Sequence, residues 1–200
     1  SEVQRFERLI AEGSPGYGVP ARTHVGHHPD GWTSFATHAG RLGAYGATPP
    51  EQLLSYLEFI DKGRLSFLRS DLNFADLGSG VGMACFTVSH LFAKVTGYED
   101  DWQLFSAAQA VLERYKAEFS NVRFVNGDLA SPRVREYNVI YIYHPFLVGY
   151  DERMPEILRR TRPGTVIIMR EADLEGLFYS SDFRLIHPRR KDYQPGNFSR

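Results

Sequence analysis

A glycine-rich turn between an apolar strand and a helix constrains this chain more than any other feature of its sequence. The short apolar stretch 73–77 runs into the segment 76–82, which reads Asp-Leu-Gly-Ser-Gly-Val-Gly. Glycines adopt positive φ angles and let a ligand approach the backbone closely, and the first turn of a helix has unpaired amide groups. In open α/β sheets, ligands lie beyond the carboxyl ends of the strands. The sequence therefore predicts a ligand site at this turn.

Strands and helices alternate from residue 73 onward, which is typical of a mostly parallel sheet covered on both faces. A length of 200 residues, 42% of them hydrophobic, suits one such domain. The stretch 137–143 is continuously apolar, which predicts a strand buried on both faces. The predicted strands cover 73–77, 94–98, 122–125, 137–143 and 165–169, with further ones near 183–186 and 197–198, and the predicted helices cover 81–92, 100–119 and 152–162.

The N-terminal quarter of the chain differs from the rest in its pattern of residues. We expect a short helix over 1–12 and then, over 13–48, an irregular arm or lid that holds eight of the 18 glycines. Thr48 and Glu51 flank two prolines in a capping-box pattern, which predicts the start of a helix. We therefore divide the chain into an arm, residues 1–48, and a domain, residues 49–200.

The spacing of the glycines argues against a dinucleotide. The dinucleotide fingerprint Gly-x-Gly-x-x-Gly would need its third glycine at Met83 or at Cys85. An acid beside the turn, Asp76, would repel a pyrophosphate but attract a sulfonium or ammonium group. This charge argument favours S-adenosylmethionine as the ligand.

Two further acids follow the next two predicted strands. Glu99 stands 19 residues after Gly80 and is placed to accept hydrogen bonds from the hydroxyls of a ribose. Asp128 follows the third strand, where it is placed to accept a bond from the amine of adenine while Leu129 packs on the ring. Each acid taken alone is more readily explained as a carboxylate of a loop or a helix cap. Together with the turn, they indicate a nucleoside site.

Residues 73–170 resemble the class I S-adenosylmethionine-dependent methyltransferases. The turn matches the first motif of that family, Glu99 the second and Asp128 the adenine-site acid, and Arg162-Pro163-Gly164 matches a further family feature. The resemblance implies a Rossmann-like, doubly wound sheet of seven strands in the order 3-2-1-4-5-7-6, with the last strand antiparallel. It also implies methyl transfer from S-adenosyl-L-methionine, with S-adenosyl-L-homocysteine as product. The residues it assigns to the cofactor in the turn are Asp76, Gly78, Ser79, Gly80 and Gly82.

The acceptor side is expected at the end of the fourth strand, where Tyr143-His144-Pro145-Phe146 follows. We assign Tyr143 and His144 as catalytic candidates, because an aromatic ring can hold a cation and histidine titrates near neutral pH. The alternative is a core tyrosine and a loop-capping histidine. The segment is similar to the Asn/Asp/Ser-Pro-Pro-Tyr/Phe motif of amino methyltransferases. Tyr143, at the polar first position, has no amide or carboxylate, which disfavours a nucleobase or glutamine acceptor.

The segment from Tyr45 to Glu51 resembles the non-SET-domain protein lysine methyltransferases. That resemblance implies that Tyr45 and Thr48 contact the carboxylate end of the cofactor, and it favours a protein side chain, lysine above all, as acceptor. Two alternatives stay open. One is a small-molecule methyltransferase with the arm as its lid, and the other is a cofactor-binding module without activity of its own.

Composition limits the remaining partners. A net charge of −1, one cysteine and no signal-peptide core favour a soluble cytoplasmic protein without a membrane partner. The spacing of the N-terminal histidines matches no standard zinc pattern, and we expect no metal. The basic clusters are interpreted as surface, so a nucleic acid is not the expected acceptor, and the oligomeric state is open. The histidines are His24, His27, His28 and His38. The basic clusters are Arg159, Arg160 and Arg162, and then Arg189, Arg190 and Lys191.

Overall fold

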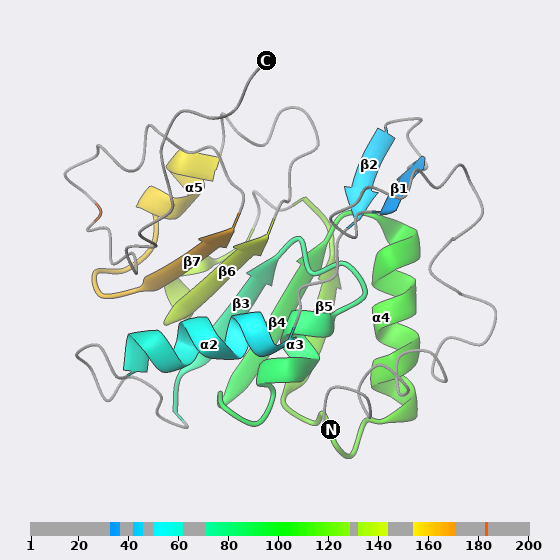
Figure 1. The fold of residues 1–200 in the computed structure, drawn as a ribbon, viewed down its shortest axis with the longest axis horizontal. Helices are drawn as coiled ribbons and strands as arrows, with labels where there is room; N and C mark the ends of the chain where they lie inside the picture. Colours follow the sequence, from blue (N-terminus) through cyan, green and yellow to red (C-terminus); the bar gives the residue numbers. More distant parts are fainter. Residues whose placement is uncertain are drawn as a thin grey trace.

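A parallel sheet of five strands forms the centre of the protein in this computed structural model (Figure 1). The strands stand in the order β5-β4-β3-β6-β7, which is 3-2-1-4-5 when they are counted along the domain. The first five positions of the predicted order are therefore confirmed. The strands are β3 (Asn73–Leu77), β4 (Lys94–Glu99), β5 (Val122–Asn126), β6 (Val139–Tyr143) and β7 (Val166–Arg170).

The structure describes residues 50–61, 71–128, 132–143, 154–169 and 183, and the backbone alone of 33–36, 42–45 and 170. The predicted strand near 197–198 lies outside these residues, as does all of the one over 183–186 except Phe183. The predicted helix over 1–12 lies outside them too. Within the described part of the chain, no helix is long and apolar enough to span a membrane.

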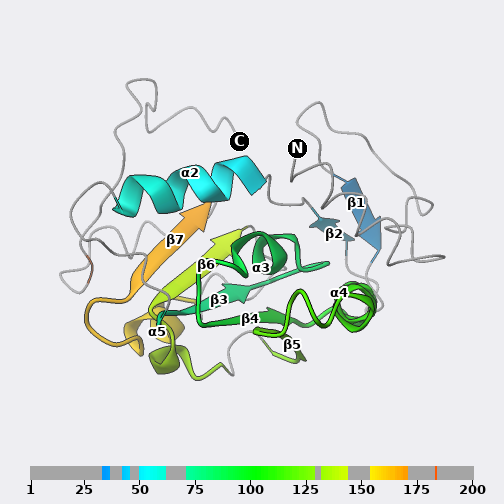
Figure 2. The same cartoon turned by 90° about the horizontal axis from the view of Figure 1, so that it is seen from below.

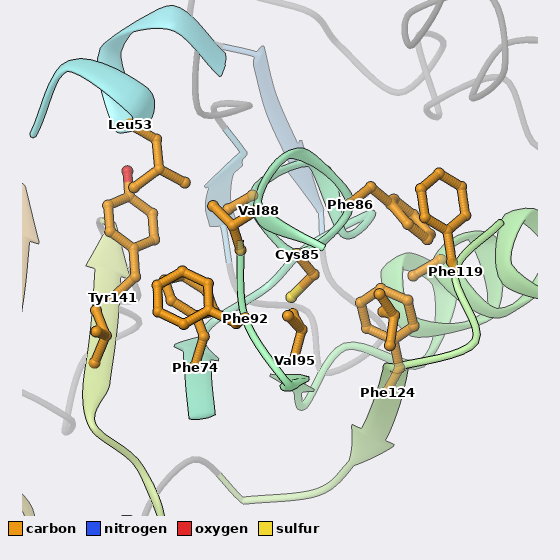
Figure 3. Close-up of a cluster of buried hydrophobic side chains, with 14 of the residues drawn as sticks. Leu53, Phe74, Cys85, Phe86, Val88, Phe92, Val95, Phe119, Phe124 and Tyr141 are labelled. Atoms are coloured by element: carbon orange, nitrogen blue, oxygen red, sulfur yellow. The ribbon is translucent and has the colours of Figure 1, made fainter. Parts of the chain in front are cut away.

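Helices cover both faces of the sheet, as predicted (Figure 2). One face packs against α2 (Pro50–Ile60), α3 (Met83–Val88) and α4 (Trp102–Arg114), and the other against α5 (Met154–Arg159) and the short 3-10 helix η2 (Val134–Glu136). The core therefore has two main apolar clusters separated by the sheet, and a small third one formed by Val81, Leu104 and Ala107. The larger one, on the side of α2, α3 and α4, is rich in aromatic rings (Figure 3).

Strand β6 is buried on both faces, as its continuous apolar sequence predicts. Val139 and Tyr141 belong to the cluster under α2 and α3, whereas Ile140 and Ile142 belong to the cluster under α5. All four are at most 1% exposed. Parallel pairing with β3 and β7 places β6 inside the sheet, where only apolar side chains avoid a desolvation cost.

The helices are shorter than predicted, and local chemistry explains two of the boundaries. Helix α3 begins at Met83 instead of Val81 because Gly82 has a left-handed backbone, with φ of 86°. Helix α4 begins at Trp102 because the carboxylate of Asp101 accepts hydrogen bonds from the amides of Gln103 and Leu104, at 2.8 and 3.0 Å. Such an N-cap fixes the first turn. At its other end α4 stops at Arg114, because Tyr115 leaves the helical conformation.

Two short strands lie within the predicted arm. Strands β1 (Thr33–Ala36) and β2 (Leu42–Tyr45) pair antiparallel, with Thr33 opposite Tyr45. The prediction of an irregular segment is wrong for these residues, because backbone pairing compensates for a sequence without clear alternation. The boundary at residue 48 stays a prediction. Helix α2 starts at Pro50, close to the predicted position, and buries Leu53 and Leu57.

Candidate functional site

The turns after β3 and β5 are both tied to the end of β4. The amides of Gly78 and Ser79 each donate to the carbonyl oxygen of Tyr98, at 2.9 Å. The carbonyl oxygen of Glu99 accepts from the Gly127 amide at 3.1 Å and from the Asn126 side chain at 2.9 Å. These bonds extend the sheet past its ladder. They bring the three strand ends that carry the predicted acids to one edge.

The turn after β3 requires glycine for its backbone. Gly78, Gly80 and Gly82 have φ angles of 91°, 55° and 86°, a left-handed region that costs an L-residue about 1–2 kcal/mol. The Gly82 amide donates to the carbonyl oxygen of Ser79 at 2.8 Å. The predicted tight turn is therefore present, and its shape is set by glycines at every second position.

Gly82 and Gly97 also make room for the aromatic core. A Cβ atom on Gly82 would stand 2.4 Å from the ring of Phe124, and one on Gly97 would stand 2.6 Å from the same ring and 2.7 Å from the Oγ atom of Ser79. Gly82 was assigned to the cofactor on the motif alone, but packing already accounts for it. Gly97 was overlooked, although an isolated glycine in a strand signals a close approach of this kind.

The substitution Gly82→Ala is expected to lower the free energy of unfolding by about 2–5 kcal/mol, from the φ cost together with overpacking against Phe124. Gly164→Ala is the matched control. Gly164 has nearly the same φ, 87°, but open space around its Cβ position, so only the φ cost of about 1–2 kcal/mol applies. Chemical denaturation of both variants measures the difference. Equal losses would contradict the packing role of Gly82.

Glu99 braces the turn from the neighbouring strand. Its carboxylate accepts hydrogen bonds from the Gly80 amide at 2.6 Å and from the Asp101 amide at 2.9 Å. Burial raises the pKa of Glu99 to about 8, and the two amide bonds oppose that rise. Each carboxylate oxygen has a second lone pair, so both can still accept a hydroxyl. The sequence foresaw the acid but not its contact with the turn.

Asp76 is a buried acid with an unsatisfied oxygen. It is 2% exposed, and its Oδ1 atom has no hydrogen-bond partner among the described residues. The other oxygen is 3.9 Å from the Sγ atom of Cys85. Burial raises the pKa of Asp76 to about 7. The buried Oγ atom of Ser79 likewise has no partner in the described part of the chain.

The two buried acids share a shortage of positive charge. Within the part of the chain that the structure describes, no basic side chain shifts the pKa of Asp76 or Glu99. Burying an acid without a cation or a full set of hydrogen bonds is costly. Groups with pKa values raised in this way cluster at functional sites. The arrangement suits a ligand that brings both hydroxyl groups and a positive charge.

The other predicted site residues are placed less completely. Asp128 is exposed two residues beyond β5. Tyr143 ends β6 at the same edge, half-buried against the cluster under α2 and α3, a position that fits either of its two interpretations. Tyr45 ends β2, and only its backbone is described. Thr48, Leu129 and His144 lie outside the described residues.

No group of three metal-binding side chains occurs in the described ranges. The histidines that raised the question of a metal lie outside these ranges, at positions 24, 27, 28 and 38.

Comparison with known proteins supports the fold. No family model matches the sequence, and no curated protein matches it. Among solved structures, an RNA methyltransferase from Salinibacter ruber in complex with S-adenosyl-L-homocysteine is 24% identical and has a TM-score of 0.52, over 64% of this chain and 80% of its own. The YcgJ protein from Bacillus subtilis is 15% identical and has a TM-score of 0.50, over 60% of this chain and half of its own. These matches confirm the predicted Rossmann-like fold.

Proposed function

We propose that this chain binds S-adenosyl-L-methionine at the carboxyl edge of its sheet and transfers the methyl group to an acceptor. The observation that carries the proposal is the left-handed glycine turn beside two buried acids, Asp76 and Glu99, that have no basic partner among the described residues. A ligand with a ribose and a cationic amino-acid end would meet both needs. The neighbour from Salinibacter ruber, with S-adenosyl-L-homocysteine bound, supports the same choice of ligand.

The residues present fit this cofactor. Asp76 and Ser79 have buried oxygens that lack partners, and these would serve its polar end. Glu99 has lone pairs left for the ribose hydroxyls, and Asp128 would serve the adenine amine, with Leu129 against the ring. When bound, the cofactor supplies an electrophilic methyl group. The protein's part is then to hold the two reactants in line, which supplies much of the rate.

A dinucleotide fits the same edge poorly. Its pyrophosphate would lie at the glycine turn, where Asp76 is buried next to the strand end. Two phosphate charges near a buried carboxylate repel it in a medium of low dielectric constant. The charge argument from the sequence is therefore supported by the burial of this acid.

For the acceptor we propose a protein side chain, with lysine favoured. The support is the resemblance of Tyr45–Glu51 to non-SET lysine methyltransferases and the aromatic ring of Tyr143 at the strand end. An amine acceptor has to lose a proton before transfer, and His144 is our candidate base. A small-molecule acceptor, or a module without activity, is the alternative.

Calorimetry with the whole chain tests the cofactor. We expect S-adenosyl-L-homocysteine to bind and NAD not to bind. Incubation with a cell lysate and S-adenosylmethionine labelled in its methyl group then tests the acceptor, and label in the protein fraction is expected. Tight binding of NAD would overturn the cofactor. Label confined to small molecules or nucleic acid would overturn the protein acceptor, and no transfer at all would favour the module.

A further inference from the structure

Five arginines gather at the amino edge of the sheet, opposite the candidate cofactor site. Arg133 and Arg135 belong to the segment around η2, and Arg159, Arg160 and Arg162 lie at the end of α5 and just after it. All five are exposed. We call them the arginine patch. The sequence shows only the second group as a cluster, and the fold adds the first.

Direct bonds hold the two segments of the patch together. The Nε atom of Arg135 donates to the carbonyl oxygen of Arg160 at 3.2 Å. Next to it, the hydroxyl of Thr165 donates to the carbonyl oxygen of Tyr137 at 3.1 Å. The arginines therefore stand on a backbone fixed at the starts of β6 and β7. A patch on a fixed backbone pays less entropy on binding than one on a loose loop.

Charge is separated across the sheet. Acids gather at its carboxyl edge. The amino edge also has acids, Asp71 before β3 and Glu118 before β5, but segments 132–138 and 159–165 hold five arginines and a single acid, Glu136, which pairs with Arg133 at 3.7 Å. The net charge of the chain is only −1, so the patch reflects separation of charge rather than a basic protein. A polyanion would be attracted to the arginine patch and repelled from the carboxyl edge. The acids of the carboxyl edge are Asp76, Glu99, Asp100, Asp101 and Asp128.

The chemistry of the patch narrows its partner. All five residues are arginines, whose planar guanidinium binds phosphate through two parallel hydrogen bonds. The large hydrophobic side chains exposed in the described residues are Phe59 and Trp102, and neither belongs to these two segments. The patch thus offers neither an apolar anchor for a membrane nor an aromatic platform for unpaired bases.

We propose that the arginine patch binds the phosphodiester backbone of a double-helical nucleic acid, without reading its sequence. Phosphate contacts fix position and carry no base information. The patch is separated from the cofactor edge by the length of β6, roughly 16 Å for five residues. It is therefore an anchoring surface, distinct from the site of methyl transfer. The proposal does not depend on the identity of the acceptor.

Fluorescence anisotropy with a labelled duplex RNA tests the patch in the full chain. The logarithm of the binding constant should fall linearly with the logarithm of salt concentration, with a slope of at most about −4.5 for five neutralised phosphates. The double variant Arg133→Gln/Arg162→Gln should reduce the size of that slope by about 2. Its affinity at low salt should fall by roughly tenfold or more.

The control is Arg114→Gln/Lys116→Gln, which removes the same charge at the C-terminal end of α4. Helices α4 and α5 lie at opposite ends of the sheet in both views (Figures 1 and 2), so the control should keep the affinity and slope of the wild type. If both variants lost the same affinity for the duplex, the effect would come from net charge alone, and the proposal would be overturned.

Two competitors complete the test. A duplex DNA of the same sequence shows whether the partner is RNA or either nucleic acid, and binding of either duplex supports the proposal. Poly-glutamate that binds as tightly as the duplexes would assign the patch to an acidic protein and overturn it. Binding of S-adenosyl-L-homocysteine by the patch variant, measured by calorimetry, should be unchanged. If the patch variant failed to bind S-adenosyl-L-homocysteine, the variant would be misfolded. If the wild type failed to bind it, the proposed function would be refuted and the proposal for the arginine patch would not.

Discussion

Replacing Asp76 with asparagine is expected to make the protein less sensitive to rising pH and to weaken its binding of the cofactor. The pKa of Asp76 is about 7 in the folded chain, above its ordinary value of 3.8, because burial disfavours the charged form. Between these two values the folded chain holds the proton more tightly than the unfolded chain does. Stability from this group is thus fully present below pH 3.8 and is lost as pH rises through 7.

The size of this pH effect on stability follows from the shift in the pKa of Asp76. One pKa unit corresponds to about 1.4 kcal/mol, so the wild type should lose about 1.4 kcal/mol per pH unit from this group between pH 4 and 7. Asparagine has no such titration. The difference in free energy of unfolding between Asp76→Asn and wild type should therefore shift in favour of the variant as pH rises, up to roughly 4 kcal/mol.

Denaturant titrations at several pH values measure this difference. Asp71→Asn, a substitution at an exposed position just before β3, controls for a general change in net charge. The same two variants are then titrated with S-adenosyl-L-homocysteine at pH 8, where loss of a charge-assisted hydrogen bond in Asp76→Asn should weaken binding by about tenfold or more. A pH profile shared by both variants, or unchanged cofactor affinity in Asp76→Asn, would contradict this account of the acid.

The expected result, weaker cofactor binding together with a smaller loss of stability at high pH, would explain why an acid stands at this position. An apolar residue of similar size would serve the strand better, because Asp76 stands in an otherwise buried strand end and its Oδ1 atom has no partner in the described residues. A group that destabilises the fold at neutral pH is retained where function requires it.

The sequence was most informative about the centre of the sheet. The strand over 73–77 was predicted with its observed bounds, and β6 was predicted to be buried on both faces. These elements are local consequences of apolar runs and glycine punctuation. The helix ends were less predictable, because they depend on backbone geometry such as the φ of Gly82 and on the Asp101 cap.

The candidate site likewise has features that the sequence predicts and features that it does not. Asp76, Glu99 and the glycines could be placed by pattern, since parallel strands bring their ends to one edge. What the pattern could not show is that Glu99 holds two backbone amides, or that Gly82 and Gly97 both face the ring of Phe124. Apart from the local bond to Asp101, those contacts join residues 19 to 42 positions apart, and only the tertiary structure brings them together.

Glu99→Gln is expected to weaken cofactor binding by about 10- to 100-fold, the loss of one to two charge-assisted hydrogen bonds. The amide group would place a donor against the amide of Gly80 or of Asp101, so the turn itself should lose about 1–3 kcal/mol of stability as well. Asp101→Asn is the matched control. It removes a nearby negative charge but keeps an N-cap of similar strength, so affinity should stay within roughly twofold.

A cofactor analogue separates the two duties of Glu99. If its carboxylate accepts the ribose hydroxyls, the 2′,3′-dideoxy form of S-adenosyl-L-homocysteine should bind wild type far more weakly than the parent compound does. In Glu99→Gln the two compounds should bind almost equally, because the acceptor that distinguishes them is impaired. Calorimetry of this double cycle measures the coupling. If the analogue loses the same affinity in both proteins, Glu99 only braces the turn, and the ribose assignment is wrong.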